Sequence, residues 1–416
     1  MENISRRGVR LSQQKRPLID DEIYSLPIPE TVLMPLSRDP DCPPEVVVEV
    51  GERVKKYQNL TKIKDASVMP VLSPFSGRVA GIEQLNHPVT GKVPFALIEV
   101  SPRQLRDKRR DREPYPLNLD DLINIAFVAG VIDESDGQPL YKKLLGIQQK
   151  APGFIICDVI DDQPFVSSSL KCLLHYMEEA AEGLKLIGKA AGYKEIMFAI
   201  YTPDGIEDKF PLKIKEIPVH MYDSNYPARP AIYDRMSGSK SKTFEAIGVQ
   251  ALAALYTVIT YSLPPVKGIV TVAGDGVRHP VNIEIPFGAP VLDVLKYCGA
   301  ADKIPQRVVF GGGLTGVAVE DLSLPVLAGT KSIIALEDTG YESNGRCVGC
   351  GDCAGVCPGR RLPMKIHEAY INDDIGNMAF YGAADCIGCG CCSWVCPCSC
   401  DVSAGIGKAR ELLINP

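Results

Sequence analysis

Two cysteine-rich runs toward the C-terminal end constrain the fold of this chain more than any other feature. Residues 347–358 read CVGCGDCAGVCP, and residues 386–397 read CIGCGCCSWVCP. Both follow the pattern C-x2-C-x2-C-x3-C-P, which is the spacing of cysteines that ligate [4Fe–4S] clusters. Glycines stand between the thiols, where the backbone has to turn sharply around a cluster. The repeated pattern therefore predicts two such clusters.

The spacing also predicts which cysteines act together. In a paired motif of this kind, three cysteines of one run hold one cluster and the fourth reaches over to the other. The expected first set is Cys347, Cys350, Cys353 and Cys396, and the second set is Cys386, Cys389, Cys392 and Cys357. A zinc site or a disulfide framework is the alternative. Zinc takes only four ligands, however, and would leave the second run unexplained.

Composition narrows the class of protein. A chain of 416 residues with 45% hydrophobic and 23% charged residues is typical of a globular protein of several domains. Its net charge of −6 argues against a general nucleic-acid binder. Of the 15 cysteines, 11 lie between 347 and 400, which favours metal ligation in a reducing compartment. No apolar stretch is long enough to span a membrane, so we expect a cytoplasmic protein, with docking to the cytoplasmic face of a membrane complex left open.

The N-terminal quarter of the chain predicts a tail and a β module. Residues 1–20 are polar and basic, and we expect a disordered tail there. Residues 21–102 contain short Val- and Ile-rich segments bounded by Pro and Gly, which predict a compact all-β unit. The stretches VGERV and SPFSGRV in this unit resemble the two halves of a barrel-sandwich hybrid domain. Residues 103–116 form a charge run that we interpret as a linker.

The middle of the chain predicts two further units. Over 117–262, strand and helix patterns alternate, with candidate strands at 153–160 and 195–201 and helices at 168–192 and 241–261. This order is typical of an α/β domain with a parallel sheet. Residues 263–330 predict a β-grasp unit with a helix that begins near Pro290. The remaining residues, 331–416, form the cluster domain, with helices expected around 363–370 and 404–414.

In this order the units resemble the RnfC family of the Rnf electron-transport complex, which also includes electron carriers associated with D-proline reductase. The motifs that carry the resemblance are SPFSGRV, VTVAGDGVRHP, VVFGGGLTGVAV and the two cysteine runs. The resemblance implies a barrel-sandwich hybrid, a Rossmann-like domain related to the flavoprotein subunit of complex I, a ligand-binding β-grasp module of the SLBB type, and a ferredoxin-type domain with two [4Fe–4S] clusters.

One loop departs from the family pattern. Members that bind FMN have a glycine-rich GGAGFPT loop whose backbone N–H groups hold the phosphate. The corresponding loop here is Glu134-Ser-Asp136-Gly137-Gln-Pro139, in which only Gly137 and Pro139 survive. The carboxylates of Glu134 and Asp136 would repel a phosphate dianion. We therefore expect that FMN binding and direct NADH oxidation have been lost.

The family's second flavin segment is altered as well. It corresponds to residues 158–165, where an acid remains at Asp161 but Gln163 replaces the second glutamate. We interpret the acidic stretches 133–136 and 158–162 as solvated turn residues, with a divalent-cation site as the alternative.

Three further cysteines follow or interrupt the second run. Cys391 is expected to be a packed free thiol. Cys398 and Cys400 are candidate redox thiols, because a C-x-C pair is able to form a strained disulfide. They are alternatively ligands of an altered cluster, or inert.

These features predict an iron–sulfur electron-transfer protein. Two [4Fe–4S] clusters would relay single electrons between a reductase and a partner oxidoreductase complex, without a catalytic residue that makes or breaks bonds. The chain would be a component of a larger complex or a carrier with protein redox partners, rather than a stand-alone enzyme. An NADH-dependent FMN and iron–sulfur oxidoreductase component is the second hypothesis, and a cluster-bearing assembly scaffold is the third.

Overall fold

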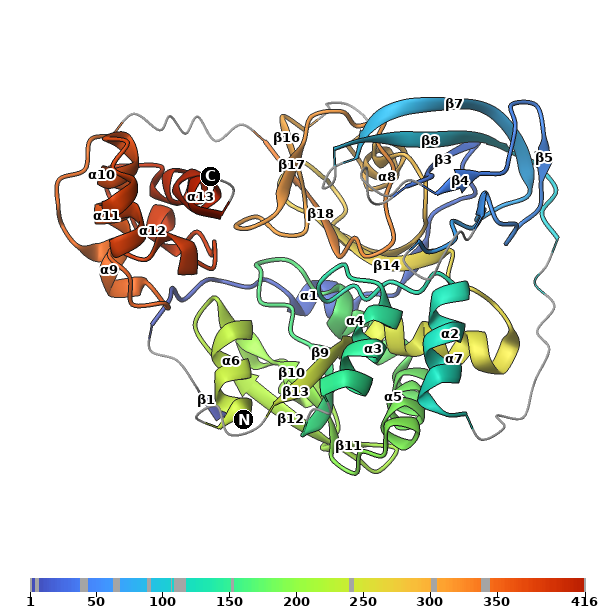
Figure 1. The fold of residues 1–416 in the computed structure, drawn as a ribbon, viewed down its shortest axis with the longest axis horizontal. Coiled ribbons are helices and arrows are strands. Elements are labelled where there is room, and N and C mark those ends of the chain that lie inside the picture. The colour runs from blue at the N-terminus through green and yellow to red at the C-terminus, as the bar shows by residue number, and fades with distance from the viewer. Residues whose placement is uncertain are drawn as a thin grey trace.

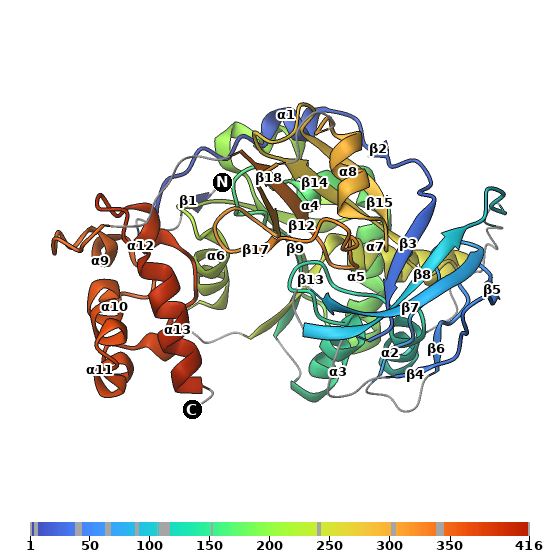
Figure 2. The ribbon, with the colours of Figure 1, turned by 90° about the horizontal axis from the view of Figure 1, so that it is seen from above.

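The computed structural model describes residues 2–3, 7–37, 44–62, 68–87, 91–105, 107, 117–150, 153–238, 243–300, 305–337 and 345–414. Within them the chain forms three units built on β-sheets and a helical C-terminal unit (Figure 1). The C-terminal helices lie at one end of the molecule, and strands β7 (Gly77–His87) and β8 (Gly91–Val100) lie toward the other (Figures 1 and 2). The molecule is thus a multidomain mixture of helices and sheets, as the sequence predicts.

The β module near the N-terminus is an antiparallel sheet in the order β3-β8-β7-β5, with a separate β4-β6 pair. Its other strands are β3 (Thr31–Pro35), β4 (Glu45–Val46), β5 (Arg53–Val54) and β6 (Thr61–Lys62). Half-buried and buried side chains alternate along β3, as expected for a sheet that packs one face on a core. That core is aliphatic and includes Val32, Leu60 and Ile98. Most of the expected linker at 103–116 lies outside the described residues.

The second unit contains a parallel sheet in the order β1-β12-β10-β9-β13. Its strands are β1 (Glu2–Asn3), β9 (Phe154–Val159), β10 (Ile196–Tyr201), β12 (Ile217–Asp223) and β13 (Phe244–Gly248), with β11 (Lys213–Ile214) paired antiparallel to β12. All side chains of β9 are buried, as in parallel sheets that are covered on both faces. The parallel pairing of β9 with β10 confirms the α/β character predicted from the sequence.

Helices surround this parallel sheet. They are α2 (Leu119–Val128), α3 (Leu140–Lys150), α4 (Ser168–His175), α5 (Met177–Ala191), α6 (Ala228–Ser237) and α7 (Val249–Tyr261), with short 3-10 turns η1 (Pro203–Gly205) and η2 (Glu207–Lys209). The helix predicted over 241–261 is wrong before Val249, because residues 244–248 form β13 and pair with β9 instead.

The third unit is a mixed sheet in the order β17-β16-β18-β14-β15-β2 with one helix, α8 (Val291–Tyr297). Its strands are β2 (Tyr24–Ser25), β14 (Lys267–Ala273), β15 (Val281–Pro286), β16 (Arg307–Phe310), β17 (Val317–Val319) and β18 (Ser332–Leu336). The helix lies where the sequence predicts it. The boundary expected at 330 falls too early, because β18 pairs with both β14 and β16.

The prediction of a disordered tail is wrong for residues 7–20. This segment runs between the C-terminal helices and the rest of the chain and ends in α1 (Arg16–Asp20) (Figure 1). Lys15 is fully buried, and its Nζ donates hydrogen bonds to the carbonyl oxygens of Gln163 at 2.6 Å and Val166 at 2.5 Å. A buried ammonium group is stable only when its donors find acceptors. These contacts therefore fix the segment in place.

The C-terminal unit is helical. Its helices are α9 (Asp352–Val356), α10 (Pro363–Ile371), α11 (Ile375–Phe380), α12 (Cys391–Trp394) and α13 (Val402–Ile414), with the 3-10 turn η3 (Ala383–Asp385). Helices α10 and α13 confirm the two helices predicted there. They pack on a small core that includes Ile366, Met378 and Ile406. In the part of the chain that the structure describes, no helix is long and apolar enough to cross a membrane.

Candidate iron–sulfur centre

The two cysteine runs repeat each other in structure as well as in sequence. Gly351 and Gly390 have positive φ angles of 86° and 77° and stand directly before the short helices α9 and α12. Gly349 and Gly388 also have positive φ, at 73° and 68°. Left-handed backbone of this kind favours glycine, because other residues carry a Cβ that is crowded there. The glycines therefore allow the sharp backbone turns that lead into the short helices α9 and α12.

Backbone N–H groups point at the sulfurs in equivalent positions of the two runs. Gly349 N donates to Cys347 Sγ at 3.4 Å, Gly388 N to Cys386 Sγ at 3.5 Å, Arg361 N to Cys357 Sγ at 3.4 Å, and Cys400 N to Cys396 Sγ at 3.4 Å. Hydrogen bonds of this type stabilise the negative charge of cluster sulfurs and help to set the reduction potential. The loops thus present the donors that an iron–sulfur cluster needs.

The second predicted ligand set lines one cavity. Cys386, Cys389 and Cys392 of the second run and Cys357 of the first run surround a space of about 70 Å³. Three predicted ligands of one run and one of the other therefore line the same space, as does Cys391. The crossed ligand set itself stays a prediction. Burial raises the pKa of the Cys386 thiol, and the nearby sulfurs of Cys389 and Cys357 raise it further.

The first predicted set is more open. Cys347 and Cys350 are exposed, whereas Cys353 is buried beside them. The thiol of Cys400 interacts with the sulfurs of both Cys396 and Cys347, so the fourth predicted ligand lies near the first run. Among the described residues, no three Cys, His, Asp or Glu side chains stand close enough together to hold a single metal ion.

The three additional thiols have different surroundings. Cys391 is buried, and its Sγ donates to the carbonyl oxygen of Tyr226 at 3.6 Å, which agrees with a packed free thiol. Cys400 is also buried, and its Sγ donates to the carbonyl oxygen of Gly345 at 3.1 Å. Cys398 is half-buried, and both thiols are free. An exposed dithiol therefore does not describe this pair, because Cys400 is covered.

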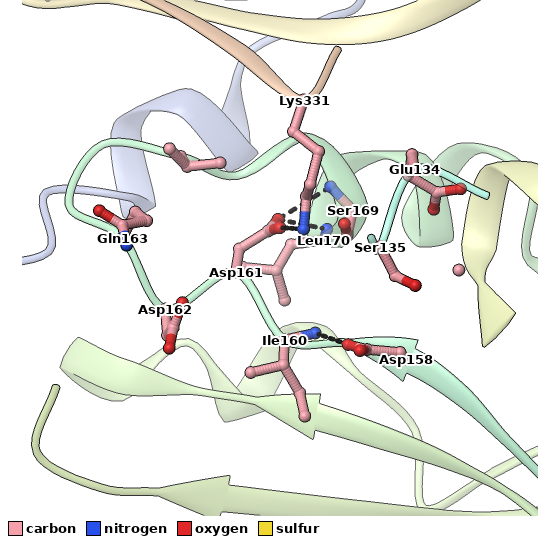
Figure 3. A network of polar contacts seen from close by, with 12 residues as sticks. Glu134, Ser135, Asp158, Ile160, Asp161, Asp162, Gln163, Ser169, Leu170 and Lys331 are labelled. Atoms are coloured by element: carbon pink, nitrogen blue, oxygen red, sulfur yellow. Dashed lines mark hydrogen bonds and ion pairs between the residues drawn. The ribbon is translucent and has the colours of Figure 1, made fainter. Parts of the chain in front are cut away.

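Most acids of the stretches 133–136 and 158–162 are buried, which corrects the expectation of solvated turns, whereas Asp136 is exposed. Asp133, Glu134, Asp158 and Asp161 are each at most 4% exposed. Figure 3 shows Asp161 and Glu134 on either side of the chain segment that holds Ser169 and Leu170. Buried carboxylates of this kind require hydrogen-bond donors or cations. The surrounding helices and basic side chains supply them.

Asp161 caps the N-terminal end of α4. Its Oδ2 accepts hydrogen bonds from Ser169 N at 2.8 Å and Leu170 N at 3.1 Å, and its Oδ1 forms an ion pair with Lys331 Nζ at 2.5 Å (Figure 3). Burial alone would raise the pKa of this carboxyl, but the charges of Lys331 and Lys15 bring it down to about 2. Asp161 is therefore ionised and fully paired.

Glu134 occupies the corresponding end of α7. Its two carboxylate oxygens accept from Gln250 N at 2.9 Å and Ala251 N at 3.1 Å. A Cβ at Gly248 would lie 2.4 Å from the carboxylate, so only glycine leaves room for it. Burial and the charge of Asp133 raise the pKa of Glu134 to about 7.

The remaining acids pair with two cations that the sequence does not single out. Lys143 Nζ lies 2.6 Å from Asp133 and 2.9 Å from Asp136, and Arg229 Nη1 lies 3.1 Å from Asp158. Burial lowers the pKa of Arg229, but the charge of Asp158 more than offsets this and raises it. Lys143 lies on α3 and Arg229 on α6, so no local sequence motif predicts these ion pairs. Ion pairs and N–H donors therefore satisfy these acids, in place of the divalent cation that was the alternative interpretation.

Comparison with known proteins shows which family the chain resembles. The family model of the RnfC barrel sandwich hybrid domain matches residues 4–102, and that of the 4Fe-4S dicluster domain matches residues 340–397. The C subunit of the ion-translocating oxidoreductase complex of Rhodobacter capsulatus is 25% identical over 401 residues, covering 91% of this chain and 77% of that protein. The chain is a homologue of RnfC.

Another relative agrees with this RnfC homology. The C subunit of the proton-translocating ferredoxin:NAD(+) oxidoreductase complex of Clostridium ljungdahlii is 24% identical over 386 residues, covering 87% of this chain and 83% of that protein. A solved NAD+-reducing [NiFe]-hydrogenase in the H2-reduced state aligns with a TM-score of 0.44 at 14% identity, covering 72% of this chain and 62% of that one. The two family models confirm the predicted barrel-sandwich module and the predicted iron–sulfur domain.

In this RnfC homologue a large cavity adjoins the altered flavin loop. It measures about 810 Å³ and is lined by residues 134–139, by Phe310 and Gly311 before the glycine-rich turn, and by Lys331. A second cavity of about 400 Å³ lies on another side of Glu134. Both spaces therefore border a carboxyl group that already binds the nearest helix N-terminus.

Proposed function

We propose that this chain is an iron–sulfur electron-transfer protein that accepts single electrons from one redox protein and passes them to another. The observation that carries the proposal is the cavity lined by Cys386, Cys389, Cys392 and Cys357. Cys391 also lines this space, and Cys357 brings a cysteine of the opposite run into it. A ligand set that draws on both runs is typical of paired [4Fe–4S] motifs.

The ligands proposed for the other cluster are Cys347, Cys350, Cys353 and Cys396. The equivalent glycines and N–H···S contacts of the two runs support a cluster in each. A bound [4Fe–4S] cluster supplies one-electron redox chemistry. The protein supplies thiolates, N–H donors that stabilise negative charge, and loops that fix the exposure of each cluster to solvent.

The proposal includes the loss of FMN. A phosphate binds where helix N-terminal N–H groups are available to it. Here Glu134 takes the N–H groups of Gln250 and Ala251, and Asp161 takes those of Ser169 and Leu170. Lys331, which lines the large cavity, is already paired with Asp161. A phosphate would therefore meet carboxyl groups at the positions where a flavin protein offers N–H donors.

The proposed partners are proteins. The relatives are named as subunits of ion-translocating oxidoreductase complexes, so we expect this chain to dock peripherally, at the cytoplasmic face, on a complex or on a soluble oxidoreductase. We further propose that the parallel-sheet unit is Rossmann-like and that the mixed sheet with α8 is an SLBB-type β-grasp module. In this view both units set the docking geometry.

Iron, acid-labile sulfide and flavin content tests the proposal on protein purified without oxygen. We expect about eight irons and eight sulfides per chain, as two [4Fe–4S] clusters require, and no flavin. Stoichiometric FMN would overturn the flavin argument and make NADH oxidation the leading function. Absence of iron from freshly purified protein would overturn the electron-transfer proposal itself.

A further inference from the structure

Gln163 joins three separate parts of the chain. Its Nε2 donates to Tyr226 Oη at 3.1 Å and to Thr315 Oγ1 at 2.9 Å, while its Oε1 accepts from Leu314 N at 3.2 Å. A Cβ at Gly312 would lie 2.5 Å from the Gln163 side chain, so the glycine-rich turn packs directly against the amide. Gln163 follows Asp161 on the loop after β9 and points away from Lys331 (Figure 3).

Tyr226 continues this connection to the second cysteine run. Its hydroxyl donates to the carbonyl oxygen of Cys389 at 2.8 Å, and its own carbonyl oxygen accepts from Cys391 Sγ at 3.6 Å. Cys389 is one of the proposed ligands, and it lines the cavity of the second set. The hydrogen bonds therefore lead from the glycine-rich turn, through Gln163 and Tyr226, to the backbone of a cluster ligand.

Apolar packing surrounds Tyr226 where it contacts the second cysteine run. Tyr226 is buried in one apolar cluster with Val9, Leu11 and Cys391, and Leu314 packs against it. Val9 and Tyr226 exchange two backbone hydrogen bonds, both of 2.9 Å. The first run has a different setting, because Cys347 and Cys350 are exposed. The two proposed clusters therefore lie in unequal surroundings, and among the described residues the hydrogen bonds of Tyr226 to cysteines reach the second run.

We infer that Gln163 and Tyr226 are positioning residues that hold the Cys389 loop on the body of the protein and set the reduction potential of the cluster in the second run apart from that of the first. This inference rests on the proposed function, because it requires clusters in both runs. The hydrogen bond from the Tyr226 hydroxyl stabilises negative charge on the carbonyl oxygen of Cys389. Gln163, which donates to the same hydroxyl, carries a neutral amide and adds no negative charge there.

The physical effect has a definite direction. Reduction adds negative charge to a cluster, so nearby hydrogen-bond donors raise its potential and nearby negative charges lower it. Replacement of the Tyr226 hydroxyl by hydrogen removes a donor. Replacement of the Gln163 amide by a carboxylate of the same shape adds a negative charge. Both changes therefore lower the potential of the cluster in the second run.

The test is a redox titration of the anaerobically purified full-length protein, followed by electron paramagnetic resonance so that the two clusters are resolved. The variants are Gln163→Glu and Tyr226→Phe. Gln149→Glu is the matched control, since it adds the same charge at an exposed position of α3. A Cys392→Ser variant identifies which signal belongs to the second run. Iron content is measured in every sample.

We expect one midpoint potential to fall in both test variants, and the affected signal to be the one that Cys392→Ser removes. The other midpoint and the control should be unchanged. Selective loss of the second-run signal from both variants, with about half of the iron, also supports the inference, because Gln163 and Tyr226 then hold that loop in place. Two unchanged midpoints at full iron content, or equal shifts of both, would overturn it. A protein that never holds two clusters would instead overturn the proposed function, and this inference with it.

Discussion

Adjacent cysteines in the second run differ in their hydrogen bonds. Cys391 and Cys392 both line the cavity of the second ligand set, but among the described residues only the Cys391 thiol donates to the carbonyl oxygen of Tyr226. Under the proposed function, removal of the Cys392 sulfur removes a ligand, and removal of the Cys391 sulfur removes a hydrogen-bonded free thiol. The pair allows a test in which position along the chain is nearly constant and only the role of the thiol differs.

We predict that Cys392→Ser lowers the iron content by about four per chain, the content of one [4Fe–4S] cluster. Cys391→Ser should keep the full iron content, since Cys391 is not a proposed ligand and a serine hydroxyl is also able to donate to the carbonyl oxygen of Tyr226. Iron and sulfide assays on protein purified without oxygen give the comparison. Equal losses in the two variants would contradict the ligand assignment for the second run.

Burial determines how much the ion pair between Lys331 and Asp161 contributes to the free energy of unfolding. The charged atoms are 2.5 Å apart, and the side chain of Asp161 is completely covered. Lys365 and Glu368 are 2.6 Å apart, but both are about half exposed, with side-chain values of 47% and 59%. Lys331→Met should lower the free energy of unfolding by about 3 kcal/mol, because it leaves a buried carboxylate without its cation.

Lys365→Met is the matched control and should change the free energy of unfolding by less than about 1 kcal/mol, as surface pairs do. Denaturant unfolding of both variants, with clusters present, provides the measurement. A similar small effect in both would mean that the N–H groups at the start of α4 suffice to stabilise Asp161.

Glu134 should give the protein a stability that depends on pH. Its pKa is raised from 4.5 to about 7 by burial and by Asp133. As pH rises above about 4.5, the unfolded chain loses this proton first, and the folded protein keeps it until about 7. The folded state is therefore destabilised across this window, by on the order of 3 kcal/mol for an isolated group.

Glu134→Gln should remove that part of the pH dependence, because the amide does not ionise. Thermal unfolding between pH 5 and 7.5 should then show a smaller decline for the variant than for the unmodified protein. Parallel pH profiles of the two proteins would show that Glu134 does not titrate in this range.

Among the elements, the N-terminal segment has the least expected role. It belongs to the region matched by the barrel-sandwich family model, yet its residues contact the cluster unit. Gly8 N donates to the carbonyl oxygen of Val356 at 2.9 Å, and Val9 N to that of Tyr226 at 2.9 Å. The segment therefore connects the end of α9 to the parallel-sheet unit, and it lies beside the second cysteine run.

Val9→Pro should loosen this connection, because proline has no N–H to donate to Tyr226. We expect faster hydrogen exchange in α12 and faster loss of iron to a chelator. Val9→Ala retains the N–H and serves as the control at the same position. If the alanine variant loses iron as quickly as the proline variant, side-chain packing rather than the backbone pairing holds the segment.

At the scale of the whole molecule, sequence reasoning succeeds where the signal is local. The two cysteine runs predict the 4Fe-4S domain that the family model matches, and an apolar run such as Phe154–Val159 indicates a strand covered on both faces. Sequence reasoning fails where a contact joins residues that are far apart along the chain. Asp, Ser and Gly favour turns, so the segment around Glu134 is predicted to be solvated. Its true partners are the N–H groups of α7, 116 and 117 residues away, which no local pattern specifies.

The same distant contacts determine how the whole molecule should accept electrons. NADH transfers two electrons as hydride and needs a flavin to divide them, whereas a [4Fe–4S] cluster takes them singly. Because Glu134 and Asp161 already accept from the N–H groups at the starts of α7 and α4, and because we propose that FMN binding is lost, we predict that NADH leaves the visible absorbance of the clusters unchanged. A low-potential one-electron donor should bleach it. Addition of FMN before NADH provides the control, and bleaching by NADH alone would mean that the altered loop still supports hydride oxidation.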